Sequence, residues 1–192
     1  MKLTPKIQKA INVAAKLHEG QIRKAGGLPY VVHPISVAWI LSEYTDEEDV
    51  IAAAFLHDVL EDVPGYYAED MTRDFGERVT RIVKGVSEDK DPNVDEESAW
   101  IERKEKYLIR LNDAGDESVM VSAADKIHNL HAMFEAYEEL GPELWGRFNA
   151  PSDKKIWFYE EVLKIVEQRF GSTHGLTIAL ESAITSFAHS CE

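Results

Sequence analysis

The sequence predicts an all-α protein. In one segment after another of the 192 residues, apolar side chains recur at the three- and four-residue spacing of amphipathic helices. No run alternates polar and apolar residues as a half-buried strand does, and neither a Walker nor a Rossmann glycine pattern is present. The length is most simply that of one domain, residues 1–192, which is large enough to bury a core.

The first helix is predicted over residues 4–19. Thr4 has the side chain of an N-cap, and Pro5 suits the first helical position because its missing N–H is not needed there. Residues 21–30, QIRKAGGLPY, form a loop because two glycines and a proline cannot continue a helix.

The next segment combines a basic pair with a helix start. Arg23 and Lys24 lie together in the loop; they are either surface charges on a turn or contacts to a ligand that approaches the glycine-rich backbone. His33-Pro34 then opens the second helix and places His33 at its N-cap. A histidine held there is well placed to point into a cleft.

The central helix is predicted to run from Asp46 to Asp62 and contains the stretch AAAFLHDVLED. His57, Asp58, Glu61 and Asp62 are spaced i, i+1, i+4 and i+5, which gathers them on one side of an otherwise apolar helix. An imidazole and three carboxylates in apolar surroundings are costly unless a positive charge neutralises them. A divalent metal ion fits this pattern better than the alternative, an acidic face in water.

The remaining helices follow from the same spacing and from Gly and Pro boundaries. They are predicted over residues 66–75, 77–86, 98–111, 119–140, 152–170 and 177–189. In the fourth of these, Asp125 lies among apolar residues, and Asn129 follows four residues later on the same face. A buried carboxylate needs a partner, so Asp125 either pairs with a nearby cation or ligates a metal.

Composition narrows the function. The net charge is −14, with 35 acidic residues against 21 Lys and Arg, which argues against nucleic acid as a partner but not against a small phosphorylated ligand. No apolar run approaches the roughly 20 residues that cross a bilayer, and the start does not read as a signal peptide. Cys191 is the single cysteine, so no intrachain disulfide or thiolate metal site is expected. We expect a cytoplasmic protein without a membrane partner.

Four side chains from three predicted helices form the candidate metal set: His33, His57, Asp58 and Asp125. Two imidazoles and two carboxylates suit Mn²⁺, Fe²⁺ or Zn²⁺. The order H…HD…D resembles the HD superfamily of metal-dependent phosphohydrolases.

The flanking sequence makes this resemblance narrower. Four ordered blocks look like those of the alarmone hydrolase domain found in the RelA/SpoT family and, alone, in the small alarmone hydrolases. They are HEGQIRKAGGLPYVVHP (18–34), AAFLHDVLEDV (53–63), FGERVTRIVKGVSEDK (75–90) and AADKIHNL (123–130). The match runs from about residue 4 to 170.

The resemblance implies an HD-domain helical bundle with one Mn²⁺ per chain, bound by the four residues of the metal set. It implies that Glu61 and Asp62 position and deprotonate the attacking water. Arg23 and Lys24 would contact the nucleotide and its phosphates, and Asn129 would line the pocket. The implied reaction is hydrolysis of the 3′-pyrophosphate of (p)ppGpp to GDP or GTP and pyrophosphate.

One departure leaves alternatives open. Members of the family often carry a lysine three residues before the aspartate of the ADxxxN block, where this chain has Ser122. A different substrate such as (p)ppApp or NADPH is therefore a second reading, and a non-catalytic nucleotide-binding module is a third. The sequence offers no room for a synthetase domain, so hydrolysis alone is expected. A homo-oligomer is compatible with the sequence.

Overall fold

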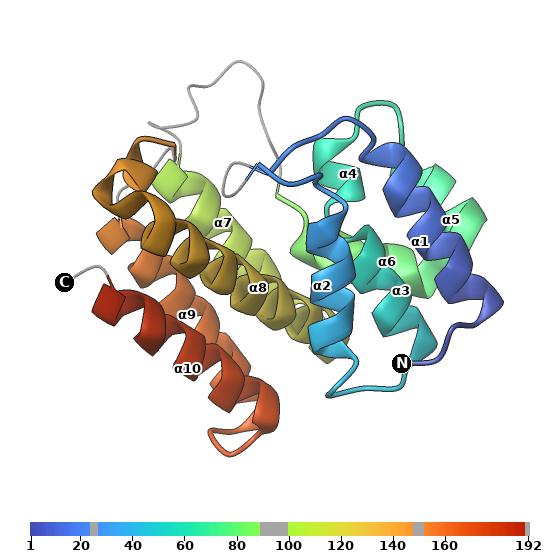
Figure 1. Ribbon diagram of the computed structural model, residues 1–192. Helices are drawn as coiled ribbons and strands as arrows, with labels where there is room; N and C mark the ends of the chain where they lie inside the picture. Colours follow the sequence, from blue (N-terminus) through green and yellow to red (C-terminus); the bar gives the residue numbers. More distant parts are fainter. Residues whose placement is uncertain (24–26, 89–99, 148–151, 191–192) are drawn as a thin grey trace.

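The computed structural model describes residues 1–23, 27–88, 100–147 and 152–190, and these segments are built from helices (Figure 1). Lys24 and Cys191 lie outside the described residues. The helices are α1 (Pro5–Leu17), α2 (Val32–Leu41), α3 (Glu48–Leu56), α4 (Val59–Asp62), α5 (Ala68–Phe75), α6 (Glu77–Val86), α7 (Trp100–Asp113), α8 (Asp116–Leu140), α9 (Ser152–Phe170) and α10 (Gly175–Ser190), with a 3₁₀ segment η1 (Gly141–Arg147) after α8. The all-α prediction is confirmed: in the described segments, β-type pairing is confined to an isolated bridge between Ile22 and Pro29.

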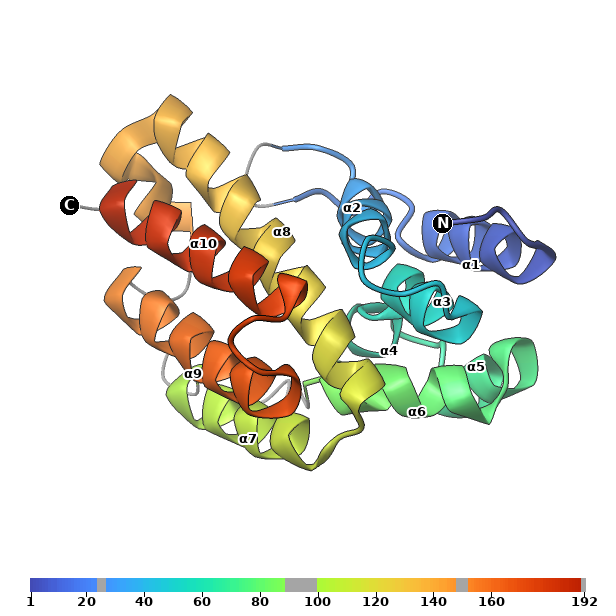
Figure 2. The same cartoon turned by 90° about the horizontal axis from the view of Figure 1, so that it is seen from below.

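Helix α8 is the axis of the bundle. Figures 1 and 2 show α9 and α10 against one side of it and α2, α3 and α6 against the other. Apolar residues are buried along most of its 25-residue length, as a helix surrounded by neighbours requires. Asp125 is buried near the middle of α8, the helix that both groups of helices contact.

The N-terminal helices begin with recognisable signals, with one correction. Thr4 caps α1, since its hydroxyl accepts a 3.2 Å hydrogen bond from the Ile7 N–H. His33, however, is not the N-cap of α2: the helix begins at Val32, so His33 lies within the first turn. The Val32 N–H already bonds the Pro29 carbonyl at 3.2 Å, so the helix starts two residues before the predicted first position, Pro34.

The predicted continuous helix 46–62 is also corrected, because the chain is divided into α3 and α4 at His57 and Asp58. In a regular helix the Ala54 carbonyl would accept the Asp58 N–H. Here Ala54 accepts a 2.8 Å bond from the His57 ring instead. Helical bonding resumes with the Asp62 N–H on the Asp58 carbonyl at 2.8 Å. The interruption therefore lies at His57 and Asp58, the two adjacent residues of the candidate metal set.

Gly76 joins α5 and α6 without an intervening loop. Its φ of +90° is a conformation that L side chains rarely adopt, and a glycine takes it at little cost. Among the described helices, none combines the length and apolarity needed to cross a membrane.

Candidate active site

The interruption between α3 and α4 presents His57 and Asp58 to a shared site. Since the Ala54 carbonyl can only accept, the His57 nitrogen bonded to it, Nδ1, carries the proton. A neutral His57 ring then has its lone pair on Nε2. That nitrogen lies 3.1 Å from Asp58 Oδ2, so the backbone contact directs Nε2, the nitrogen able to bind a metal, toward the carboxylate.

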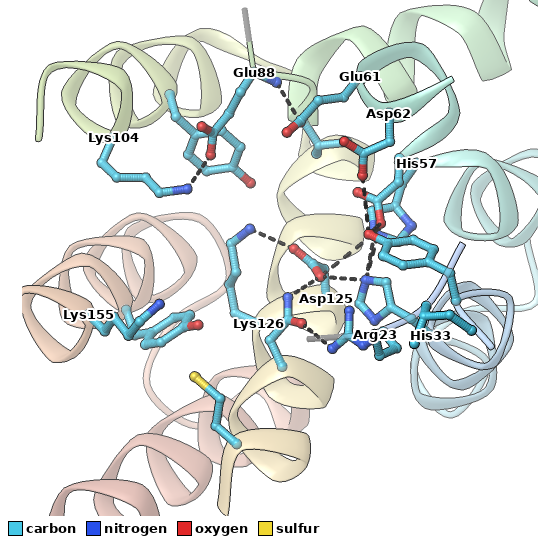
Figure 3. A pocket seen from close by; sticks show the side chains of 18 residues that line it. Arg23, His33, His57, Glu61, Asp62, Glu88, Lys104, Asp125, Lys126 and Lys155 are labelled. Carbon is cyan, nitrogen blue, oxygen red and sulfur yellow. Dashed lines mark hydrogen bonds and ion pairs between the residues drawn. The ribbon is translucent and has the colours of Figure 1, made fainter. Parts of the chain in front are cut away.

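His33, from the first turn of α2, joins the same cluster. Its Nε2 lies 3.1 Å from His57 Nε2 and 3.3 Å from Asp58 Oδ2. It also lies 3.1 Å from Asp125 Oδ1 on α8. The four residues of the metal set, from three segments far apart in the chain, are therefore neighbours in the fold, and Figure 3 shows His33, His57 and Asp125 close together.

Asp125 is paired with a cation, which is one of the two alternatives that its burial left open. One carboxylate oxygen, Oδ2, accepts a 2.6 Å bond from the Lys126 ammonium. The other, Oδ1, faces His33 and accepts a 2.6 Å bond from the Asn129 amide. Lys126 thus fixes the carboxylate from one end and leaves its second oxygen directed at the imidazoles.

The cluster favours a bound positive charge. Burial alone would raise the pKa of Asp58, but the adjacent His57 and His33 hold it well below its usual value. Burial opposes ionisation of Asp125 as well, and Lys126 with the two histidines still lowers its pKa strongly. Burial lowers the pKa of His57, yet Asp58 and Asp125 raise it well above 6.5. These carboxylates therefore remain ionised and hold a cation or a proton next to them.

A divalent ion fits this arrangement. Ligand atoms about 2.1 Å from a common ion and at right angles to each other lie about 3 Å apart. The donor atoms of His33, His57 and Asp58 are separated by 3.1 to 3.3 Å. Among the described residues these three form a group with metal-binding geometry, and Asp125 adjoins it through His33.

Tyr30 is a site residue that sequence reasoning missed. Its hydroxyl donates a 2.6 Å hydrogen bond to Asp58 Oδ2 and lies 3.3 Å from Asp62 Oδ2. Burial, followed by the charges of these two carboxylates, raises its pKa, so the phenol stays protonated as the donor. The only sequence signal is its place in the RKAGGLPY loop.

The cluster opens onto a cavity of about 400 Å³. Glu61 and Asp62, one turn beyond the His57–Asp58 pair, line this cavity as the predicted spacing required. Glu61 Oε2 accepts a 3.0 Å bond from the backbone N–H of Glu88. Both candidate water-activating carboxylates are therefore held at the edge of the same space.

Three lysines line the cavity, two of them across from the metal set and the third bonded to Asp125. Figure 3 shows Lys104 of α7 and Lys155 of α9 on the side of the cavity away from His33 and His57, whereas Lys126 of α8 lies next to Asp125. Lys104 donates to Glu88 and lies 4.6 Å from the centre of the Phe158 ring. Burial lowers its pKa, although Glu88 opposes the shift. No role was predicted for these lysines; for Lys126 its position next to Asp125 was an available signal.

Arg23 and Asn129 connect the loop to α8. Arg23 Nη2 donates a 2.8 Å bond to Asn129 Oδ1, and the guanidinium carbon lies 5.6 Å from the centre of the Tyr30 ring. Both residues line the cavity. The structure therefore brings two of the three predicted substrate contacts together, whereas the third, Lys24, is outside the described residues.

Ser122 occupies a buried position behind the cavity. Its side chain is 1% exposed and shares a 2.7 Å hydrogen bond with the Tyr107 hydroxyl. Tyr107 lines the cavity, and the Lys126 ammonium lies 4.7 Å from the centre of its ring. Among the described residues, Tyr107 thus links Ser122 to the cavity.

Comparison with protein families and curated proteins identifies relatives. The family model described as HD domain matches residues 10–145. The bifunctional (p)ppGpp synthase/hydrolase SpoT of Escherichia coli K12 is 36% identical over 129 residues, which is 67% of this chain and 18% of that protein. A GTP pyrophosphokinase of Streptomyces coelicolor is 39% identical over 128 residues, 66% of this chain and 14% of that protein. This chain therefore corresponds to less than a fifth of each of these two relatives.

Solved structures match over more of their length. A metazoan ortholog of SpoT that hydrolyses ppGpp and plays a role in starvation responses has a TM-score of 0.76 and 25% identity, covering 96% of this chain and 97% of that chain. A protein of Listeria monocytogenes EGD-e has a TM-score of 0.68 and 24% identity, covering 80% of this chain and 96% of that chain. The second likeness concerns the fold alone.

Proposed function

This chain belongs to the HD-domain family, and we propose that it is a metal-dependent hydrolase of (p)ppGpp. It would remove the 3′-pyrophosphate and release GDP or GTP. The observation that carries the proposal is a single cavity lined by the His33–His57–Asp58 cluster on one side, by Lys104 and Lys155 opposite, and by Lys126 bonded to Asp125. The likeness to a metazoan ppGpp hydrolase over nearly its full length supports the choice of substrate.

The metal is proposed to be one Mn²⁺, held by His33, His57, Asp58 and Asp125. Two imidazoles and two carboxylates form a mixed nitrogen and oxygen set that suits this ion. When bound, it would lower the pKa of the attacking water and polarise the scissile phosphate.

Glu61 and Asp62 are proposed to position that water and accept its proton. A carboxylate within reach of the nucleophile contributes general-base catalysis. The Glu88 N–H fixes one oxygen of Glu61, and the Tyr30 hydroxyl contacts Asp62. These contacts would hold the pair oriented before substrate arrives.

The substrate phosphates are proposed to meet Lys104, Lys126 and Lys155, while Arg23, Lys24 and Asn129 contact the nucleotide. A protein of net charge −14 repels an anionic nucleotide unless cations are concentrated at the site. Fixed cations in the cavity would also stabilise charge that develops on the leaving pyrophosphate. We expect residues 1–192 to act as one domain in the cytoplasm, on a small nucleotide rather than on nucleic acid.

A substrate panel tests the proposal. Mn²⁺-loaded protein is incubated with ppGpp, ppApp, NADPH and dNTPs, and pyrophosphate and orthophosphate are both measured. We expect pyrophosphate and GDP from ppGpp. Preferred turnover of ppApp or NADPH would reassign the substrate within the same chemistry. Binding of ppGpp without turnover would instead support the non-catalytic module and contradict the proposal.

A further inference from the structure

His33 has a second contact that the proposed chemistry does not use. Its Nδ1 lies 2.8 Å from Nδ1 of His128 on α8, with the ring centres 4.9 Å apart. Two bare nitrogen lone pairs at this distance would repel each other, so one of the two nitrogens must carry a proton. The proton's position decides which nitrogen of His33 can bind a metal.

The proposed metal binding by His33 determines which of the two Nδ1 atoms carries the proton. Nε2 of His33 faces His57, Asp58 and Asp125 and must offer a lone pair there to bind an ion. A neutral His33 ring then has its proton on Nδ1 and donates it to His128. We propose that His128 is a positioning residue, whose Nδ1 accepts this proton and fixes both the tautomer and the ring orientation of His33. This inference rests on the proposed metal centre.

His57 offers a direct comparison. Its Nδ1 donates at the same distance, 2.8 Å, to the Ala54 carbonyl, a backbone acceptor that no side-chain substitution removes. Both imidazoles therefore present Nε2 to the site, one fixed by the backbone and one by a side chain. Partners of this kind typically contribute about 10- to 100-fold to metal affinity.

A second cavity dictates how His128 should be replaced. This cavity, of about 490 Å³, lies beside the metal set and is lined by both His33 and His128. A small substituent such as alanine would let water enter and accept the His33 proton in place of His128. His128→Leu keeps the volume and removes the acceptor. His128→Asn provides Oδ1 as an acceptor close to the position of the original Nδ1.

The test measures Mn²⁺ affinity by calorimetry in these variants and in His131→Leu. His131 is exposed one turn further along α8 and lines the same second cavity, which makes it a matched control. We expect His128→Leu to weaken Mn²⁺ binding about 10- to 100-fold, and His128→Asn and His131→Leu to remain within about threefold of the parent. Equal affinity of His128→Leu and the parent would overturn the inference, as would a loss in His128→Asn as large as that in His128→Leu.

A spectroscopic readout is independent of turnover and of any variant that fails to fold. Imidazole ¹⁵N shifts of the parent protein loaded with diamagnetic Zn²⁺ report which nitrogen carries each proton. We expect His33 protonated on Nδ1 and His128 on Nε2; a proton on His128 Nδ1 would refute the inference.

If the parent hydrolyses ppGpp and His128→Leu binds Mn²⁺ equally well, only this inference fails. If these affinities and shifts hold but no substrate is cleaved, the proposed reaction fails and the inference stands.

Discussion

The Tyr30 hydroxyl donates a 2.6 Å hydrogen bond to Asp58 Oδ2, which ties the glycine-rich loop to the centre of the metal set. Tyr30→Phe removes this donor from a partly buried carboxylate and is expected to cost about 1–3 kcal/mol, equivalent to roughly a 5- to 150-fold loss in Mn²⁺ affinity if the cost falls on binding. Calorimetric titration with Mn²⁺ provides the measurement.

Tyr66→Phe is the matched control, because it also removes a tyrosine hydroxyl bonded to an aspartate, Asp74, at 3.2 Å outside the active-site cavity. It should leave Mn²⁺ affinity unchanged. Equal effects of the two substitutions would mean that Tyr30 acts on stability alone.

Substitutions at Asp58 and at Glu61 should have different effects on Mn²⁺ binding and on catalytic turnover. Asp58→Ala removes a carboxylate 3.1 Å from the His57 nitrogen and should abolish metal binding and activity together. Glu61→Gln keeps the size of the side chain but not its basicity, so Mn²⁺ should still bind while kcat falls by about 10²- to 10⁴-fold. Metal content and single-turnover rates distinguish the two. A Glu61→Gln enzyme as fast as its parent would exclude Glu61 as the base.

Mn²⁺ binding should release protons. In the metal-free protein, burial lowers the pKa of His57 but Asp58 and Asp125 raise it well above 6.5, so the ring holds an extra proton at neutral pH. The ion must displace that proton from Nε2, and Mn²⁺ affinity should therefore fall as the pH falls. Calorimetry in buffers of different ionisation enthalpy gives the proton count, expected to be about one per ion. A binding enthalpy independent of buffer would contradict this assignment.

Lys104 should contribute to substrate binding rather than to metal binding. It lines the cavity from α7, and Lys104→Met removes its charge while keeping most of its length. A charged hydrogen bond to phosphate contributes about 1.5–3 kcal/mol, so KM for ppGpp should rise roughly 10- to 150-fold at unchanged Mn²⁺ affinity. Lys106→Met is the control, since Lys106 lies on the same helix, exposed and paired with Glu102 at 2.7 Å. Similar KM values in both variants would remove Lys104 from the substrate site.

The helices could be predicted from the sequence because their signals are local, as the exact agreement of α6 with residues 77–86 illustrates. The break between α3 and α4 could not be predicted from the sequence. The dihedrals of His57 (φ −60°, ψ −33°) remain helical, and the break arises because the His57 ring, rather than a backbone N–H, donates to the Ala54 carbonyl. The convergence of His33 with Asp125 had a sequence signal only in the ordered motif. Tyr30 and His128 lie within the RKAGGLPY and AADKIHNL segments, but their contacts had no sequence signal, because their partners are distant in the chain and only tertiary packing brings them together.

Ser122, which stands where members of the family often carry a lysine, should affect the stability of the protein more than its choice of substrate. Ser122 is not among the described residues that line the active-site cavity, and its hydroxyl is satisfied by Tyr107. Ser122→Ala should destabilise the protein by about 1–3 kcal/mol because it leaves the buried Tyr107 hydroxyl without this partner. Combining it with Tyr107→Phe should recover much of that loss, and urea unfolding of both single variants and the double variant measures the coupling.

Ser122→Lys should be more damaging than Ser122→Ala. The family's usual lysine would here enter a site that is 1% exposed and face Tyr107, whose ring already lies 4.7 Å from the Lys126 ammonium. Two ammonium groups would then compete for the Asp125 carboxylate, and an unpaired buried charge costs about 3–5 kcal/mol.

The ratio of ppGpp to ppApp turnover in Ser122→Ala, which retains the cavity lining, should equal that of the parent. If Ser122→Ala instead changed the ratio of ppGpp to ppApp turnover, Ser122 would act on the substrate base through Tyr107. The serine would then be a determinant of substrate specificity.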